Sequence, residues 1–247
     1  MNKKRFWFLF LVLSVYIIVI AFPIYLITND IYVRAIVMLS LRSAYLIFII
    51  LFSLFSKLAK TYNGTPRTRN FFLLLPIFAV AFMDLFYWGV VSKSTFSLDS
   101  GALLGLKIAT IIVTVLEEEI LFRLVVQKNI MLRHKIIRIL ISATIFALAH
   151  IFNILFDTFP VIYPIELLEL IVLFVIGVIL GFLYEYTNNI LIPISFNLIY
   201  SFCTDLLFRN LFFGANYKYY ITIGAFLLFG IAYLHIFYFL MLKKENR

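Results

Sequence analysis

Three consecutive glutamates, Glu117, Glu118 and Glu119, lie inside an apolar segment that is otherwise suited to cross a membrane. Arg123 follows four residues after Glu119, about one helical turn further on and therefore on the same face. A carboxylate at bilayer depth costs several kcal/mol, so charge in such a place marks a transport path, a buried ion pair or chemistry. We therefore expect the function of the chain to reside in this segment.

Two further apolar segments carry polar residues at a similar depth. The helical rise of about 1.5 Å per residue places Glu118 roughly 15 Å, and His150 roughly 18 Å, from the cytoplasmic end of its segment. Asn197 and Ser201 lie roughly 12 and 18 Å deep by the same measure. Polar groups in hydrocarbon need partners, so these side chains are expected to meet.

Their chemistry suits hydrolysis. A carboxylate and a neutral imidazole can share a water molecule, one removing its proton while the other orients it. An amide or hydroxyl at Asn197 or Ser201 can donate a hydrogen bond to a developing oxyanion. Structural interpretations remain open as well: Glu119 with Arg123 fits a structural ion pair, and Glu117 fits contact with a polar neighbour or cavity.

The composition predicts a polytopic membrane protein. The chain has 247 residues, of which 64% are hydrophobic and 13% are charged, and its mean hydropathy is +1.08. A soluble domain has about a quarter of its residues charged. A single cysteine, Cys203, excludes an internal disulfide and a thiolate metal cluster. We expect an all-α chain that forms a single transmembrane domain over residues 1–247.

Polar and Pro/Gly interruptions divide the chain into about eight transmembrane helices. We place them near 6–28, 35–56, 71–91, 102–127, 139–156, 165–186, 190–208 and 220–242. An even number puts both termini on one side. That side carries most of the 21 Lys and Arg residues and is therefore predicted to be cytoplasmic. The net charge of +9 then reflects topology and anionic headgroups, and no nucleic-acid partner is expected. Gly177 and Gly181 predict close helix packing.

Two sequence motifs occur in order in successive segments. Glu118-Glu119 and Arg123 fit the pattern E-E-x-x-x-R, and Phe146 with His150 fits F-x-x-x-H. In this order they resemble the CAAX-protease and bacteriocin-processing (CPBP, Abi) family of intramembrane proteases. The likeness covers a catalytic core at about residues 102–205.

The resemblance implies a bundle of eight membrane helices with an internal polar cavity open toward the cytoplasmic half. It implies that Glu118 and His150 activate a water for peptide hydrolysis, with Glu119, Arg123 and Phe146 supporting them. Substrates in the family are prenylated C-terminal motifs in eukaryotes, and peptides or membrane-proximal segments in bacteria. Some bacterial members accompany bacteriocin loci in peptide maturation or self-immunity.

The third motif of the family, H-x-x-x-N or H-x-x-x-D after a Pro-apolar pair, is altered here. Asn197 occupies the His position and Ser201 the Asn/Asp position, after Pro193. An amide can still donate to an oxyanion, but it cannot bind a metal as an imidazole does. One His and one Glu fall short of the three protein ligands usual for catalytic zinc. We therefore expect no cofactor, and a family-style zinc ion is weakly supported.

The leading hypothesis is a bacterial intramembrane endopeptidase of the cytoplasmic membrane, with Glu118, His150 and Asn197 catalytic and Ser201 supporting. Its partners are a peptide or membrane-protein substrate and the lipid bilayer; the oligomeric state is left open. A second hypothesis, favoured by the altered third motif, is a catalytically weakened scaffold or immunity protein. A third, a small transporter with Glu118, His150 and Asp205 as a proton relay, leaves the two ordered motifs unexplained.

Overall fold

The chain folds into packed helices, and no β-strand occurs within the described ranges. The computed structural model describes residues 3–20, 30–55, 74, 77, 101–130, 132, 134–158, 164–202, 230, 232, 233, 235, 236 and 239. The elements are α1 (Lys3–Ile20), α2 (Ile31–Phe55), α5 (Gly101–Glu119), η5 (Ile120–Gln127), α6 (Lys135–Thr158), α7 (Pro164–Thr187) and α8 (Leu191–Ser201). The predicted all-α class is therefore confirmed, whereas the count of eight helices stays a prediction.

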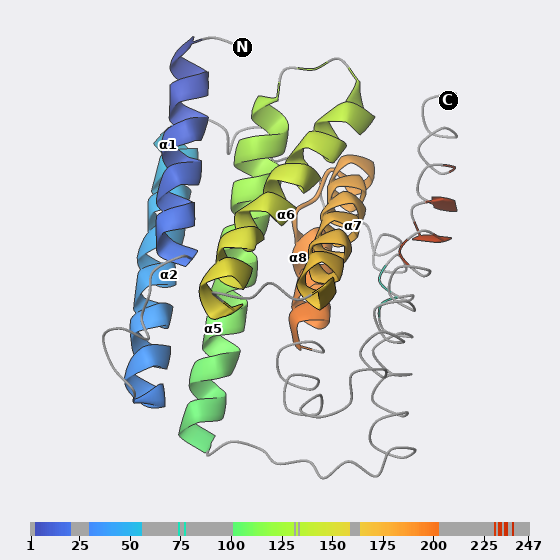
Figure 1. The fold of residues 1–247 in the computed structure, drawn as a ribbon. Coiled ribbons are helices and arrows are strands. Elements are labelled where there is room, and N and C mark those ends of the chain that lie inside the picture. The colour runs from blue at the N-terminus through green and yellow to red at the C-terminus, as the bar shows by residue number, and fades with distance from the viewer. Residues whose placement is uncertain are drawn as a thin grey trace, which may run out of the picture.

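Helix α5 and its continuation η5 form the centre of this arrangement. α5 packs against α2 and α8, and η5 packs against α2, α6 and α7. Figure 1 shows α1 and α2 side by side at one edge, with α7 and α8 together on the other side of α5. The three glutamates end α5, so they lie between the helices that contact α5 and those that contact η5.

The segment predicted as one helix near 102–127 changes its hydrogen-bond register. η5 is a π-helix, with one extra residue in each hydrogen-bonded turn, and it begins directly after Glu119. Two side chains satisfy carbonyls in this segment: Ser142 Oγ donates to Phe122 O at 3.0 Å, and Asn129 Nδ2 donates to Val125 O at 2.7 Å. π-helical turns are rare in proteins, and those that do occur are often found at functional sites.

Two predicted boundaries are set by short polar side chains. Asp30 caps α2, since its Oδ1 accepts the backbone N–H groups of Tyr32 at 2.8 Å and Val33 at 3.3 Å. α2 therefore begins at Ile31, four residues before the segment placed near 35–56. Asn188 has φ 51° between α7 and α8, a left-handed conformation that asparagine adopts more readily than most residues. The predicted break at this sequence is confirmed.

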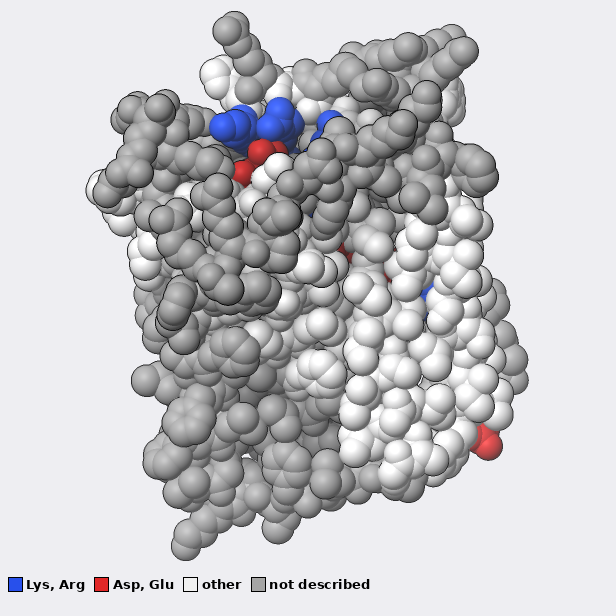
Figure 2. All heavy atoms as spheres, turned by 180° about the vertical axis from the view of Figure 1, so that it is seen from behind, with Lys and Arg blue, Asp and Glu red and all other residues white. Residues whose placement is uncertain are grey.

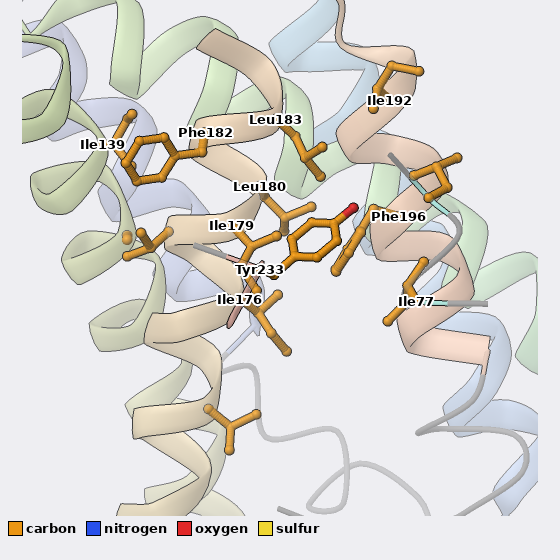
Figure 3. Packing of buried hydrophobic residues seen from close by; sticks show 14 residues of the cluster. Ile77, Ile139, Ile176, Ile179, Leu180, Phe182, Leu183, Ile192, Phe196 and Tyr233 are labelled. Carbon is orange, nitrogen blue, oxygen red and sulfur yellow. The ribbon is translucent and has the colours of Figure 1, made fainter. Parts of the chain in front are cut away.

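Close packing of α6, α7 and α8 builds the larger apolar core. An added Cβ on Gly177 would lie 3.1 Å from Ala143 Cα, and one on Gly181 would lie 2.8 Å from Ile139 Cγ2. Both glycines of α7 thus let α6 approach, as their spacing predicted. Figure 3 shows the Tyr233 ring among apolar side chains of α7 and α8. This core fixes α6 and α8, which carry His150 and Asn197.

Two described helices are long and apolar enough to cross a membrane by themselves, at Ile31–Phe52 and Leu170–Thr187. Many of their neighbours expose large apolar side chains, including Trp7, Leu148 and Leu191. These surfaces fit a membrane protein. The segments predicted near 71–91 and 220–242 lie almost entirely outside the described residues, and the internal cavity stays a prediction.

Candidate active site

The three glutamates at the end of α5 are all buried, yet each has a different environment. The side chains of Glu117 and Glu119 are 0% exposed, whereas that of Glu118 retains 8%. Successive residues of a helix point about 100° apart, so three neighbours in sequence face three different sets of helices. Each carboxylate consequently has a different partner.

Glu117 faces α2. Its Oε1 lies 3.5 Å from Nη1 of Arg42, and both side chains are almost fully buried. This is the polar neighbour expected for Glu117. In the sequence, Arg42 is a charged residue inside an apolar segment. This position is the one sign in the sequence that Arg42 needs a buried partner.

Glu119 is held on both carboxylate oxygens. Arg123 Nε donates to its Oε2 at 3.0 Å, and Asn197 Nδ2 donates to its Oε1 at 2.9 Å. The Arg123 guanidinium also lies over the Phe146 ring, 5.8 Å from the centroid, where a cation is attracted to the π-face. The predicted structural ion pair is confirmed, and it connects the first motif with the helix of the third.

Glu118 faces His150 of α6. The distance between Glu118 Oε1 and His150 Nε2 is 3.4 Å, and the His150 side chain is 15% exposed. Tyr16 of α1 donates its hydroxyl to the same Oε1 at 3.3 Å. Glu118 is thus the one carboxylate of the three without an arginine as its direct partner, and it is paired with an imidazole.

The second ring nitrogen of His150 fixes how the pair is protonated. His150 Nδ1 lies 2.8 Å from the carbonyl oxygen of Phe146. A carbonyl can only accept, so Nδ1 carries a hydrogen and donates it. Nε2 and Glu118 Oε1 are then in contact and would repel as two bare acceptors. The pair therefore holds one proton between these two atoms.

Asn197 does not occupy the place that equal depth suggested. It was expected to face Glu118 and His150, but its direct hydrogen bond is to Glu119. Its Oδ1 accepts the Ser201 hydroxyl at 3.5 Å, so the two residues at the altered third motif contact one another. One amide N–H is used by Glu119, which leaves the second N–H of the amide group. Asp205 lies outside the described residues.

Tyr16 was not singled out by the sequence, because it is one of 15 tyrosines and belongs to no motif. It is fully buried, and 102 residues separate it from the carboxylate that it contacts. Only the packing of α1 against α2 and α6 brings it to the site.

The donor set does not fit a zinc site. Among the described residues, no three His, Cys, Asp or Glu side chains are grouped to hold a metal ion. The glutamate beside the Glu118–His150 pair is Glu119, and both of its oxygens are taken by Arg123 and Asn197. We therefore derive no step that involves a metal.

The described helices bring a carboxylate of α5 and an imidazole of α6 into contact. A family model described as type II CAAX prenyl endopeptidase Rce1-like matches residues 100–203. The match spans α5 to α8 and both motifs. The matched description agrees with the family that the motifs indicated, and over these residues the chain is similar to the CAAX-type intramembrane proteases. Comparison with curated proteins and with solved structures gave no match.

Proposed function

We propose that the protein is an intramembrane endopeptidase that hydrolyses a peptide bond with a water activated by Glu118 and His150. The observation that carries the proposal is the 3.4 Å contact between Glu118 Oε1 and His150 Nε2. Both side chains retain some exposure, whereas Glu117 and Glu119 are sealed and engaged by arginines. A general base must reach a water, and of the three carboxylates Glu118 has this access.

In the proposed reaction Glu118 takes a proton from water, while His150 acts through its contact with Glu118 Oε1 and holds the carboxylate toward that water. The resulting hydroxide attacks the scissile carbonyl carbon, and its oxygen becomes an oxyanion. The second N–H of Asn197 is proposed to donate to this oxyanion. Collapse breaks the C–N bond, and the proton held by the Glu118–His150 pair passes to the leaving amine. Glu119 and Arg123 take no part in the bond changes and keep α5, η5 and α8 in register.

We infer that the substrate is a peptide or a membrane-proximal segment of a protein. The family model names a prenyl endopeptidase, so prenylated C-terminal peptides are one substrate class to test. We place the protein in a bacterial cytoplasmic membrane with both termini cytoplasmic. Figure 2, which shows the molecule from behind, has basic side chains beside acidic ones near the top of the view. Independently of that view, Lys128, Lys135 and Arg138 lie where η5 ends and α6 begins, which supports a cytoplasmic location for this turn.

The alternative is a scaffold or immunity protein that binds a partner without hydrolysis. The observation that favours it is the hydrogen bond from Asn197 to Glu119, since this bond gives the altered third motif a structural role.

Proteolysis by the purified protein separates the two. Wild type and Glu118→Ala are incubated in proteoliposomes with prenylated and unprenylated peptides, and new termini are identified by mass spectrometry. The proposal expects cleavage by the wild type that Glu118→Ala lacks. Equal cleavage by both, or cleavage of no substrate together with partner binding, contradicts it.

A further inference from the structure

The hydroxyl of Tyr16 joins α1 to the site. Tyr16 is fully buried, and its hydroxyl donates to Glu118 Oε1 at 3.3 Å. A hydroxyl that donates to a carboxylate makes a charge-assisted hydrogen bond, and at 3.3 Å this one is longer than the strongest of its kind. A phenol buried at a carboxylate therefore does more than fill space.

Packing fixes the direction in which this hydroxyl points. The Tyr16 ring meets Phe122 of η5 edge-on at 5.5 Å between centroids, and it lies 5.7 Å from the Tyr45 ring. Tyr45 is in turn anchored, because its hydroxyl donates to Val12 O at 2.8 Å. The phenol is thus held by rings from α2 and η5 and does not depend on Glu118 for its position.

Two contacts converge on the same carboxylate oxygen. Tyr16 Oη lies 3.3 Å from Glu118 Oε1, and His150 Nε2 lies 3.4 Å from it. A carboxylate oxygen has about two lone-pair sites, so these two contacts occupy Oε1. Oε2 is then the oxygen that remains to receive a proton from water. The carboxylate is also prevented from rotating, because rotation breaks both contacts.

We propose that Tyr16 is a positioning residue for the hydrolysis assigned above: its hydroxyl holds Glu118 Oε1 so that Oε2 faces the water. This inference rests on the proposed function. It also extends the site beyond residues 100–203, since α1 lies outside the region that the family model matches. Helix α1 is then a part of the active site as well as a membrane segment.

The test compares Tyr16→Phe with Tyr45→Phe. Both substitutions remove one buried hydroxyl from the same aromatic cluster, but only Tyr16 contacts a carboxylate. With a cleaved peptide, Tyr16→Phe is expected to lower kcat about 10- to 100-fold, as the loss of a hydrogen bond to a charged group does. KM is expected to change less than about twofold, because Tyr16 acts on the base and not on substrate binding. Tyr45→Phe, which keeps the ring beside Tyr16 and loses only the hydrogen bond to Val12 O, is expected to lower kcat much less than Tyr16→Phe does.

The outcomes separate this inference from the proposed function. Glu118-dependent cleavage with equal kcat in the two Phe variants overturns the role of Tyr16 alone, and so does a raised KM with kcat unchanged. No Glu118-dependent cleavage in the wild type overturns both. If Tyr16→Phe has a lower Tm than Tyr45→Phe, 3-fluorotyrosine at position 16 keeps the shape and changes the donor strength. A kcat that is unchanged in this fluorinated protein also overturns the role.

Discussion

Replacing Glu119 by alanine is the perturbation whose cost follows most directly from the structure. Its carboxylate accepts from Arg123 Nε at 3.0 Å and from Asn197 Nδ2 at 2.9 Å, and the Glu119 and Arg123 side chains are both 0% exposed. Arg123 Nη1 and Nη2 already have no hydrogen-bond partner among the described residues. Without Glu119, the contact with the Phe146 ring is the one that remains to the guanidinium among the described residues.

The magnitude follows from the two broken contacts. Stranding one partner of a buried ion pair costs about 3–5 kcal/mol. Leaving the buried Asn197 donor unsatisfied costs about 1–3 kcal/mol more. Native proteins are stable by about 5–15 kcal/mol, so Glu119→Ala is expected to remove a large part of the total.

Unfolding of the purified protein in mild detergent, followed by circular dichroism, measures this loss. Glu119→Gln is the matched control, because its amide oxygen still accepts from one partner and the cavity is not enlarged. We expect the unfolding free energy to fall in the order wild type, Glu119→Gln, Glu119→Ala. Glu118→Gln, whose partners are a phenol and an imidazole, is expected to lose less than Glu119→Ala. A Glu119→Ala protein as stable as the wild type would refute the structural role of the pair.

Two further predictions concern α8 and α7. Asn197→Ala is expected to lower turnover about 100-fold or more if its second N–H serves the oxyanion, with little change in KM, and Asn197→His is expected to retain or raise activity; steady-state kinetics on folded variants checks both, and unchanged turnover in Asn197→Ala would leave the amide only its bond to Glu119. Gly177→Leu is expected to destabilise the protein by about 1–3 kcal/mol through overpacking against Ala143. Gly105→Leu is the control, because an added Cβ there meets nothing within 4 Å; equal stability of the two variants in thermal unfolding would argue against the close α6–α7 contact.

Local sequence patterns were sufficient to predict the parts of the site whose residues lie close together in the sequence. The spacing of four residues between Glu119 and Arg123 predicted their ion pair, since such neighbours share a helix face. The polar interruption between two apolar segments predicted the break between α7 and α8, where the structure has Asn188 in a left-handed conformation. Depth arithmetic brought Glu118 and His150 to one level, where the structure places them in contact.

Contacts between distant helices had no such pattern. Arg42 lies 75 residues from Glu117, and Tyr16 lies 102 residues from Glu118. These contacts depend on which helices pack side by side. Neither composition nor periodicity predicts that pairing of helices. The depth of Asn197 likewise could not distinguish Glu118 from Glu119, because adjacent residues differ in depth by only about 1.5 Å. The π-helical register of η5 also has no signature in composition.

The central claim is that Glu118, and not the glutamate beside it, performs the chemistry. The most direct measurement is kcat/KM for Glu118→Gln and Glu117→Gln on the same cleaved peptide, after circular dichroism has shown both proteins to be folded. Glu118→Gln is expected to lose at least about 100-fold, the usual contribution of a general base. Glu117→Gln is expected to retain turnover, because its partner is Arg42 and it has no contact with His150. Wild-type turnover in a folded Glu118→Gln protein would contradict the account.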